Sequence, residues 1–120
     1  MSGIFLTRAP PKSAVVKFFG ISIPAFTTLA VDAVDFVDHV TAKWLVTLVN
    51  STDTEIQSYE VVANYLTGKV NPSYTVYSLI GDKIKNKAEV VISGGDLTLE
   101  IENKETVTLT ADILRFDLST

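Results

Sequence analysis

The acidic and imidazole side chains between residues 32 and 39 are the group in this sequence best suited to chemistry. Asp32, Asp35 and Asp38 recur every third residue, and His39 follows directly. On one helical turn these groups would converge, which would suit a divalent cation or acid–base catalysis. Aspartates at this spacing in a crossover are more often its solvated side, with one of them capping a turn. We therefore predict no metal site here, and a metal-dependent enzyme at these residues is the third functional hypothesis.

Other catalytic motifs are missing from the sequence. His39 is the only histidine and there is no cysteine, which excludes two-histidine metal sets, thiolate metal sites and cysteine nucleophiles. The segment Ser93-Gly94-Gly95-Asp96 lacks the lysine and the following helix of a phosphate-binding loop, and it is typical of a hairpin turn. No nucleophile elbow or dinucleotide-binding fingerprint is present. We expect no enzyme and no cofactor.

Tyrosines offer a second kind of site, an aromatic platform for sugars. A carbohydrate-binding β-sandwich module is therefore the alternative function, although tyrosines in strands mostly pack with the hydroxyl at the rim. The candidates are Tyr59, Tyr65, Tyr74 and Tyr77.

Basic residues could indicate contact with nucleic acid. Lys83, Lys85 and Lys87 alternate along residues 82–91, which favours an edge strand guarded against aggregation. The net charge of −4 argues against a protein that neutralises phosphates. We expect no nucleic-acid partner.

The elements that would position these residues are β-strands. With 120 residues, of which 47% are hydrophobic, the chain fits one globular domain. Apolar and polar residues alternate, most regularly over residues 97–102, so we predict about eight strands in an antiparallel, jelly-roll-like β-sandwich. One interior is expected to hold Trp44, Val46, Leu48, Val61, Leu97, Leu99 and Ile101.

Two stretches depart from this alternation. Aspartates and valines recur every three residues over 31–40, which predicts a short helical turn or a bulged crossover. The last strand, 106–118, is apolar at odd positions up to Ala111 but at even positions from Leu114. That change of phase predicts a bulge, or a strand whose two halves serve different sheets.

The N-terminal residues differ from the rest. We predict an extended arm over residues 1–13 and a single sandwich domain over 14–120. Ile4, Phe5 and Leu6 are apolar, and Pro10-Pro11 imposes a stiff, non-helical path. These five residues are the predicted interface with a neighbouring subunit, which favours a homo-oligomer.

The apolar run at residues 18–26 follows basic residues and could suggest a signal peptide. Because the run alternates and is shorter than the roughly 20 residues of a membrane span, we expect a soluble protein with no membrane partner.

Several segments in order resemble small β-rich virion structural proteins of tailed bacteriophages. They are Val31–Asp35, Thr41-Ala42-Lys43-Trp44-Leu45-Val46, Tyr59-Glu60-Val61, Leu79-Ile80-Gly81-Asp82, Ser93–Leu99 and Leu114-Arg115. The family often carries a His-Asp-Gly turn after its Glu-Val strand, where this chain has Ala63-Asn64-Tyr65-Leu66. The resemblance implies a multi-copy capsid decoration (cement), neck or tail component, made in the host cytoplasm and located in the virion. Its partners would be other copies of itself and other virion proteins.

Overall fold

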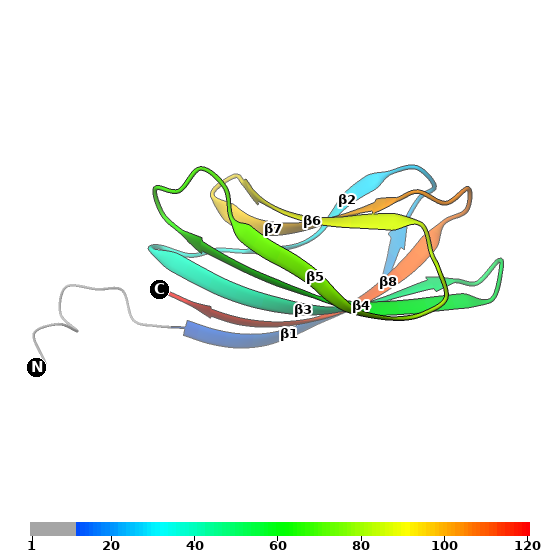
Figure 1. The fold of residues 1–120 in the computed structure, drawn as a ribbon. Helices are drawn as coiled ribbons and strands as arrows, with labels where there is room; N and C mark the ends of the chain where they lie inside the picture. The colour runs from blue at the N-terminus through cyan, green and yellow to red at the C-terminus, as the bar shows by residue number, and fades with distance from the viewer. Residues whose placement is uncertain (1–11) are drawn as a thin grey trace, which may run out of the picture.

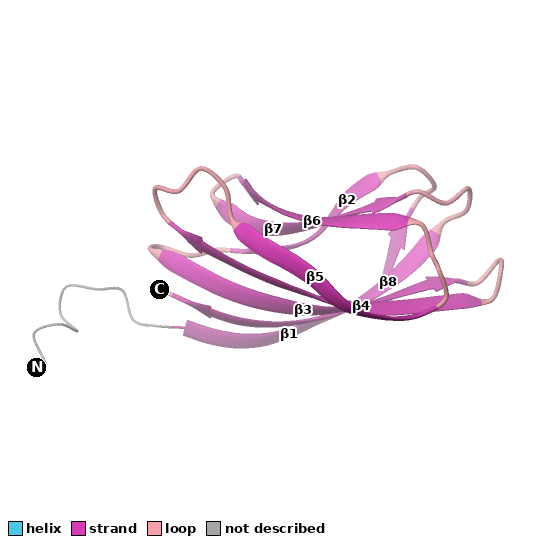
Figure 2. Cartoon of the chain, in the orientation of Figure 1, coloured by secondary structure: helices cyan, strands magenta, loops and turns pink. Residues whose placement is uncertain are grey.

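The computed structural model describes residues 12–120, and all regular structure in that range is β-strand (Figure 2). The predicted fold class is confirmed: the described chain forms an all-β sandwich of eight strands in two antiparallel sheets. Along the chain the strands are β1 (Lys12–Ile23), β2 (Thr28–Val34), β3 (His39–Asn50), β4 (Glu55–Leu66), β5 (Ser73–Gly81), β6 (Asn86–Ser93), β7 (Asp96–Asn103) and β8 (Leu109–Ser119).

The two sheets differ in width. The larger sheet has the order β1-β8-β3-β4-β5, and the smaller sheet has the order β2-β7-β6 (Figure 1). The chain's first and last strands pair with each other, and the second strand pairs with the seventh, while β3, β4 and β5 follow one another as neighbours in the larger sheet. Because the sheets hold five and three strands, the smaller sheet does not extend over the whole inner face of the larger one.

The core lies between the sheets and follows the alternation of the sequence. On β3, Trp44, Val46 and Leu48 are fully buried, while Lys43 and Leu45 between them point outward. The hairpin of β6 and β7 turns at Ser93–Asp96 and brings Leu97, Leu99 and Ile101 into the same interior. All seven residues predicted to share one interior belong to one buried cluster.

The prediction that the last strand contains a bulge, or that its two halves serve different sheets, is wrong. β8 pairs with β3 without a register shift, and the bulge in its pairing with β1 lies on β1, between Phe18 and Ile21. Odd positions of β8 face inward along its whole length: Leu109, Ala111 and Ile113 are buried, and so is Asp117. The direction in which the side chains point stays regular along β8, and only the type of residue at the inward positions changes. Near the end of β8 these inward positions hold the charged residues Arg115 and Asp117. Leu114, Phe116 and Leu118 consequently lie on the outer face of the larger sheet.

Residues 31–40 contain no helical turn. The pairing of β2 with β7 shifts register between Ala30 and Asp32, and β2 then continues to Val34 before a short loop leads into β3. A bulge inserts one residue into the strand and changes the face on which the following side chains lie. The bulged form of the prediction therefore matches the structure, and the helical form does not.

The N-terminal boundary falls earlier than predicted. Lys12 and Ser13 already belong to β1, where they pair with Ser119 and Leu118 of β8. Ile4, Phe5, Leu6, Pro10 and Pro11 lie outside the described residues. In the described part of the chain, no helix is long and apolar enough to cross a membrane.

Candidate functional site

A largely buried ionic network lies between the two sheets. Asp32 on β2 accepts hydrogen bonds from Trp44 Nε1 at 2.9 Å and from Arg115 Nη1 at 2.7 Å. Arg115 Nε donates to Asp117 Oδ2 at 2.7 Å. Burial acts to lower the pKa of Arg115, but the hydrogen bonds that Arg115 donates to the carboxylates of Asp32 and Asp117, together with their charges, outweigh it and raise the pKa above its usual value. These hydrogen bonds connect Asp32 of β2 with Trp44 of β3 and Arg115 of β8. The network therefore joins the smaller sheet to the larger one.

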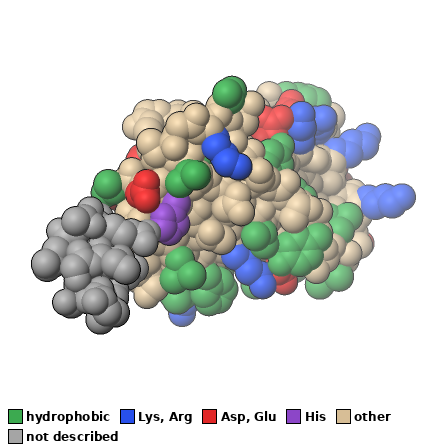
Figure 3. All heavy atoms as spheres, turned by 60° about the vertical axis from the view of Figure 1, so that its left-hand side comes forward, with side chains coloured by type: hydrophobic (Ala, Val, Ile, Leu, Met, Phe, Trp, Pro, Cys, Tyr) green, Lys and Arg blue, Asp and Glu red, His purple; other side chains and the backbone are tan. Residues whose placement is uncertain are grey.

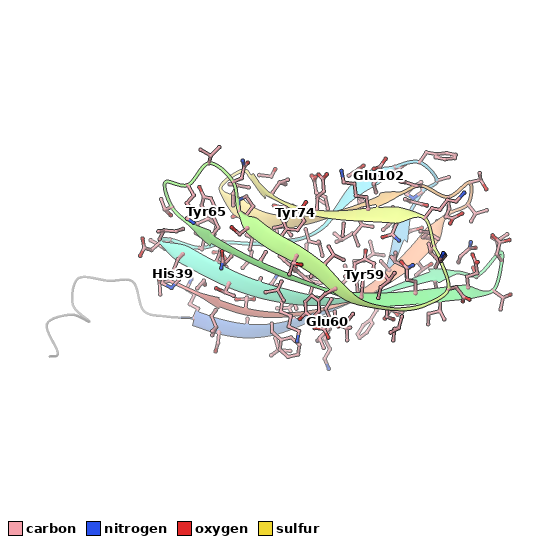
Figure 4. The ribbon with its side chains drawn as sticks, in the orientation of Figure 1. His39, Tyr59, Glu60, Tyr65, Tyr74 and Glu102 are labelled. Atoms are coloured by element: carbon pink, nitrogen blue, oxygen red, sulfur yellow. The ribbon has the colours of Figure 1, made fainter. Side chains whose placement is uncertain are left out.

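The predicted acidic cluster is not brought together. Asp32 points into this network, whereas Asp35 and Asp38 are exposed in the loop before β3. His39 is part-exposed, with Nδ1 3.2 Å from Thr120 Oγ1 and 3.7 Å from a carboxylate oxygen of Asp38 (Figure 4). Residues 12–120 contain no group of three or more acidic or histidine side chains placed to hold a metal ion.

The four tyrosines do not form one platform. Tyr59 is buried between the sheets, where its hydroxyl donates to Asn86 Oδ1 at 2.9 Å, and burial raises its pKa. Tyr65 stacks edge-on against Phe36, with ring centroids 5.5 Å apart. Tyr74 and Tyr77 lie on opposite faces of β5, since the first pairs with inward Ala63 and the second with outward Glu60. No observation on these residues favours a sugar site.

In the structure, the predicted edge strand contains only one of the three lysines of residues 82–91. Lys87 lies on β6, which is an edge strand of the smaller sheet, and it pairs with Glu89 at 2.6 Å. Lys83 and Lys85 precede β6 in the loop from β5.

The two outer faces of the sandwich differ in chemistry. Glu89, Glu100 and Glu102 share the outer face of the smaller sheet with Lys87. None of the exposed large hydrophobic side chains of residues 12–120 lies on β2, β6 or β7. Figure 4 labels Glu102 on this face and Glu60 on the opposite one. The outer face of the smaller sheet is therefore acidic and hydrophilic.

The outer face of the larger sheet carries the exposed apolar side chains instead. We call the part over β1, β8 and β3 the apolar face; it consists of Val15, Phe19, Leu45, Phe116 and Leu118, which are 40% to 74% exposed. Strand pairing places Val15 beside Phe116 and Leu45 beside Leu114, and Lys17, Lys43 and Asp112 lie on the same face. In Figure 3, hydrophobic side chains on the lower side of the molecule lie together with Lys or Arg side chains. Exposed apolar side chains grouped on one face are candidates for an interaction site.

Two shallow hollows shape the apolar face. One of about 310 Å³ lies among Lys17, Phe19 and Leu45, and one of about 280 Å³ lies among Val15, Phe116 and Leu118. Hollows between apolar side chains give a partner's side chains positions to fill, which is how buried anchors form in protein interfaces.

A polar triad borders the apolar face on β3, β4 and β5. Glu60 accepts from Lys43 Nζ at 2.9 Å and from the Tyr77 hydroxyl at 2.7 Å. These hydrogen bonds lower the pKa of Glu60 and raise the pKa of Lys43 and of Tyr77. The charges of Lys43 and Glu60 are thus paired with each other.

Sequence reasoning missed the apolar face, although its signal was present. The even-numbered apolar residues of β8 were interpreted as the sign of a bulge, or of a strand divided between two sheets, rather than as a surface. The signal was the pair of charges at inward positions 115 and 117, which require a polar partner across the core. No known family model matches this chain, and no curated protein matches its sequence.

Proposed function

We propose that this chain is a non-enzymatic structural protein of a tailed-phage virion, present in many copies as a capsid decoration, neck or tail component. The observation that carries the proposal is the difference between the two outer faces: an acidic face on the smaller sheet and the apolar face on the larger one. A protein that covers a particle needs one surface for its neighbours and one for water. The resemblance of the sequence to virion proteins of tailed phages is the reason for proposing a virion location.

The proposed attachment has two parts. The apolar face would pack on other virion proteins, because burying its side chains removes apolar area from water. The N-terminal arm, with Ile4, Phe5 and Leu6, would reach a neighbouring copy. A pattern of many identical weak contacts gives firm attachment through multivalency.

Mass spectrometry of purified particles, with copy number, tests this function. We expect the chain in every particle, in tens of copies or more for a decoration protein and in a small symmetric number for a neck or tail station. Its absence from purified particles would overturn the proposal.

A pair of variants tests the proposed surface. Val15→Lys with Leu118→Lys places two charges on the apolar face and should reduce incorporation into particles. Glu100→Lys on the opposite face is the matched control and should leave incorporation unchanged. Equal incorporation of both variants would show that the apolar face is not the attachment surface.

A further inference from the structure

Strand β5 is an edge of the larger sheet and differs from the other three sheet edges in the described chain. It runs for nine residues, Ser73–Gly81, without a charged side chain. Two of the other edge strands carry exposed charges, Lys12 and Lys17 on β1 and Lys87 with Glu89 on β6, and the one charged residue of β2, Asp32, is buried against Arg115. Charges and bulges on an edge strand prevent pairing with another chain. Among the sheet edges of residues 12–120, β5 alone has no charged residue, and its register shift with β4 comes only after Tyr77.

The inner side of β5 is also only partly covered. The core ends at β4, where Tyr59, Val61 and Ala63 are at most 2% exposed. On β5 the corresponding inward residues Tyr74 and Val76 are each 42% exposed. The smaller sheet ends at β6, and Val76 of β5 lines a hollow with Asn86 and Ala88 of that strand rather than packing closely against it.

From these observations we infer that β5 pairs with β5 of a second copy of this chain, antiparallel and across a twofold axis centred on Thr75. This inference rests on the proposed function, because it supplies one of the contacts between copies. A twofold axis through Thr75 places this residue opposite its own counterpart and its neighbours opposite one another, so a charge at the axis would face a like charge. The segment Ser73–Tyr77 carries no charge and pairs regularly with β4, before the register shifts at Ser78.

The pairing accounts for the exposed residues on both sides of β5. With Thr75 at the centre, Tyr74 of one copy lies opposite Val76 of the other on the inner side. Aromatic and β-branched residues directly opposite each other stabilise an antiparallel pair. The axis is perpendicular to the sheet, so the two larger sheets become one sheet of ten strands. Both apolar faces then lie on the same side, and the dimer presents twice the attachment surface.

Charge substitutions at Thr75 test the pairing in solution, on the full chain and without particles. Thr75 is exposed on the outer face beside Val62, so a longer side chain there should not disturb the core. Sedimentation equilibrium should show a dimer for the native chain. Thr75→Lys and Thr75→Glu should each weaken dimerisation about tenfold or more, because like charges face each other across the axis. An equimolar mixture of the two variants should restore a heterodimer.

The matched control is Thr28→Lys, which adds the same charge on the β2 edge and should dimerise like the native chain. Because the chain has no cysteine, Thr75→Cys also provides a single-site disulfide test, with Thr28→Cys as its control. A monomeric native chain, or dimerisation that Thr75→Lys leaves unchanged, would overturn the pairing. The result is distinct from that of the proposed function: a monomer that still enters particles refutes this contact alone.

Discussion

Arg115 and Asp32 are 83 positions apart in the chain, yet Arg115 Nη1 lies 2.7 Å from each carboxylate oxygen of Asp32. The pair joins β8 of the larger sheet to β2 of the smaller one. Only 11% of the Arg115 side chain and 3% of the Asp32 side chain are exposed. In the described chain every buried side-chain nitrogen and oxygen has a hydrogen-bond partner, so this interior depends on its polar groups staying paired.

Removing the arginine should therefore destabilise the fold strongly. Arg115→Met leaves the carboxylates of Asp32 and Asp117 buried without a counter-charge, and breaking a buried pair in this way costs about 3 to 5 kcal/mol. Urea denaturation measures the change in the free energy of unfolding. Lys87→Met is the control, because it breaks an exposed ion pair, which contributes little to stability. Equal losses in the two variants would refute the importance of the network.

Trp44 combines packing with a hydrogen bond, and two substitutions separate these contributions. Trp44→Ala removes the largest fully buried side chain and should cost about 3 to 5 kcal/mol. Trp44→Phe keeps most of the packing but removes the Nε1 donor to Asp32, for which we expect about 1 to 3 kcal/mol. Thermal unfolding monitored by circular dichroism checks both values. A melting temperature unchanged in Trp44→Ala would contradict the position of Trp44 in the core.

Tyr59 gives the fold a sensitivity to alkali. Burial raises the pKa of its hydroxyl in the folded chain, while in the unfolded chain the group ionises near its ordinary value of 10.0. Its contribution to stability is therefore complete below about pH 10 and is lost as the pH rises through the raised folded value. In this range the native chain should lose up to about 1.4 kcal/mol per pH unit more than Tyr59→Phe, which cannot ionise.

Measurement of the unfolding free energy from about pH 9 to pH 11 in both proteins tests this point. The variant lacks the hydrogen bond to Asn86 and should be less stable than the native chain at neutral pH. The two curves should then converge as the pH rises. Parallel curves would show that Tyr59 ionises freely in the folded chain.

Residues 1–11 should be dispensable for folding. Every strand of the described chain begins at or after Lys12, so a chain that starts there keeps both sheets. Its circular dichroism spectrum and melting temperature should match those of the full chain. Incorporation into particles should fall, because burial of Ile4, Phe5 and Leu6 could contribute about 1.5 to 3 kcal/mol per side chain before the cost of ordering the arm.

Two results would change this view of the arm. If the truncated chain fails to fold, residues 1–11 belong to the domain itself. If it enters particles as well as the full chain does, the arm has no part in attachment.

The class of the fold and most of the core could be predicted from the amino-acid pattern alone. Alternation with period two places side chains on opposite faces of a strand, so residues such as Trp44 and Leu99 could be assigned to the interior without coordinates. The Gly-Gly turn similarly predicted the hairpin of β6 and β7. These features depend on neighbours along the chain, and local geometry is enough to predict them.

Which face of β8 is buried depends on contacts between distant parts of the chain. Leu114, Phe116 and Leu118 are apolar, and local pattern alone assigns them to the core. Arg115 and Asp117 take the inward positions because Asp32, on a distant strand of the other sheet, pairs with the arginine there. The same long-range pairing removes Asp32 from the acidic cluster and leaves the apolar face exposed. A charge is stable inside a protein only with its partner, and the position of that partner is set by how the two sheets pack.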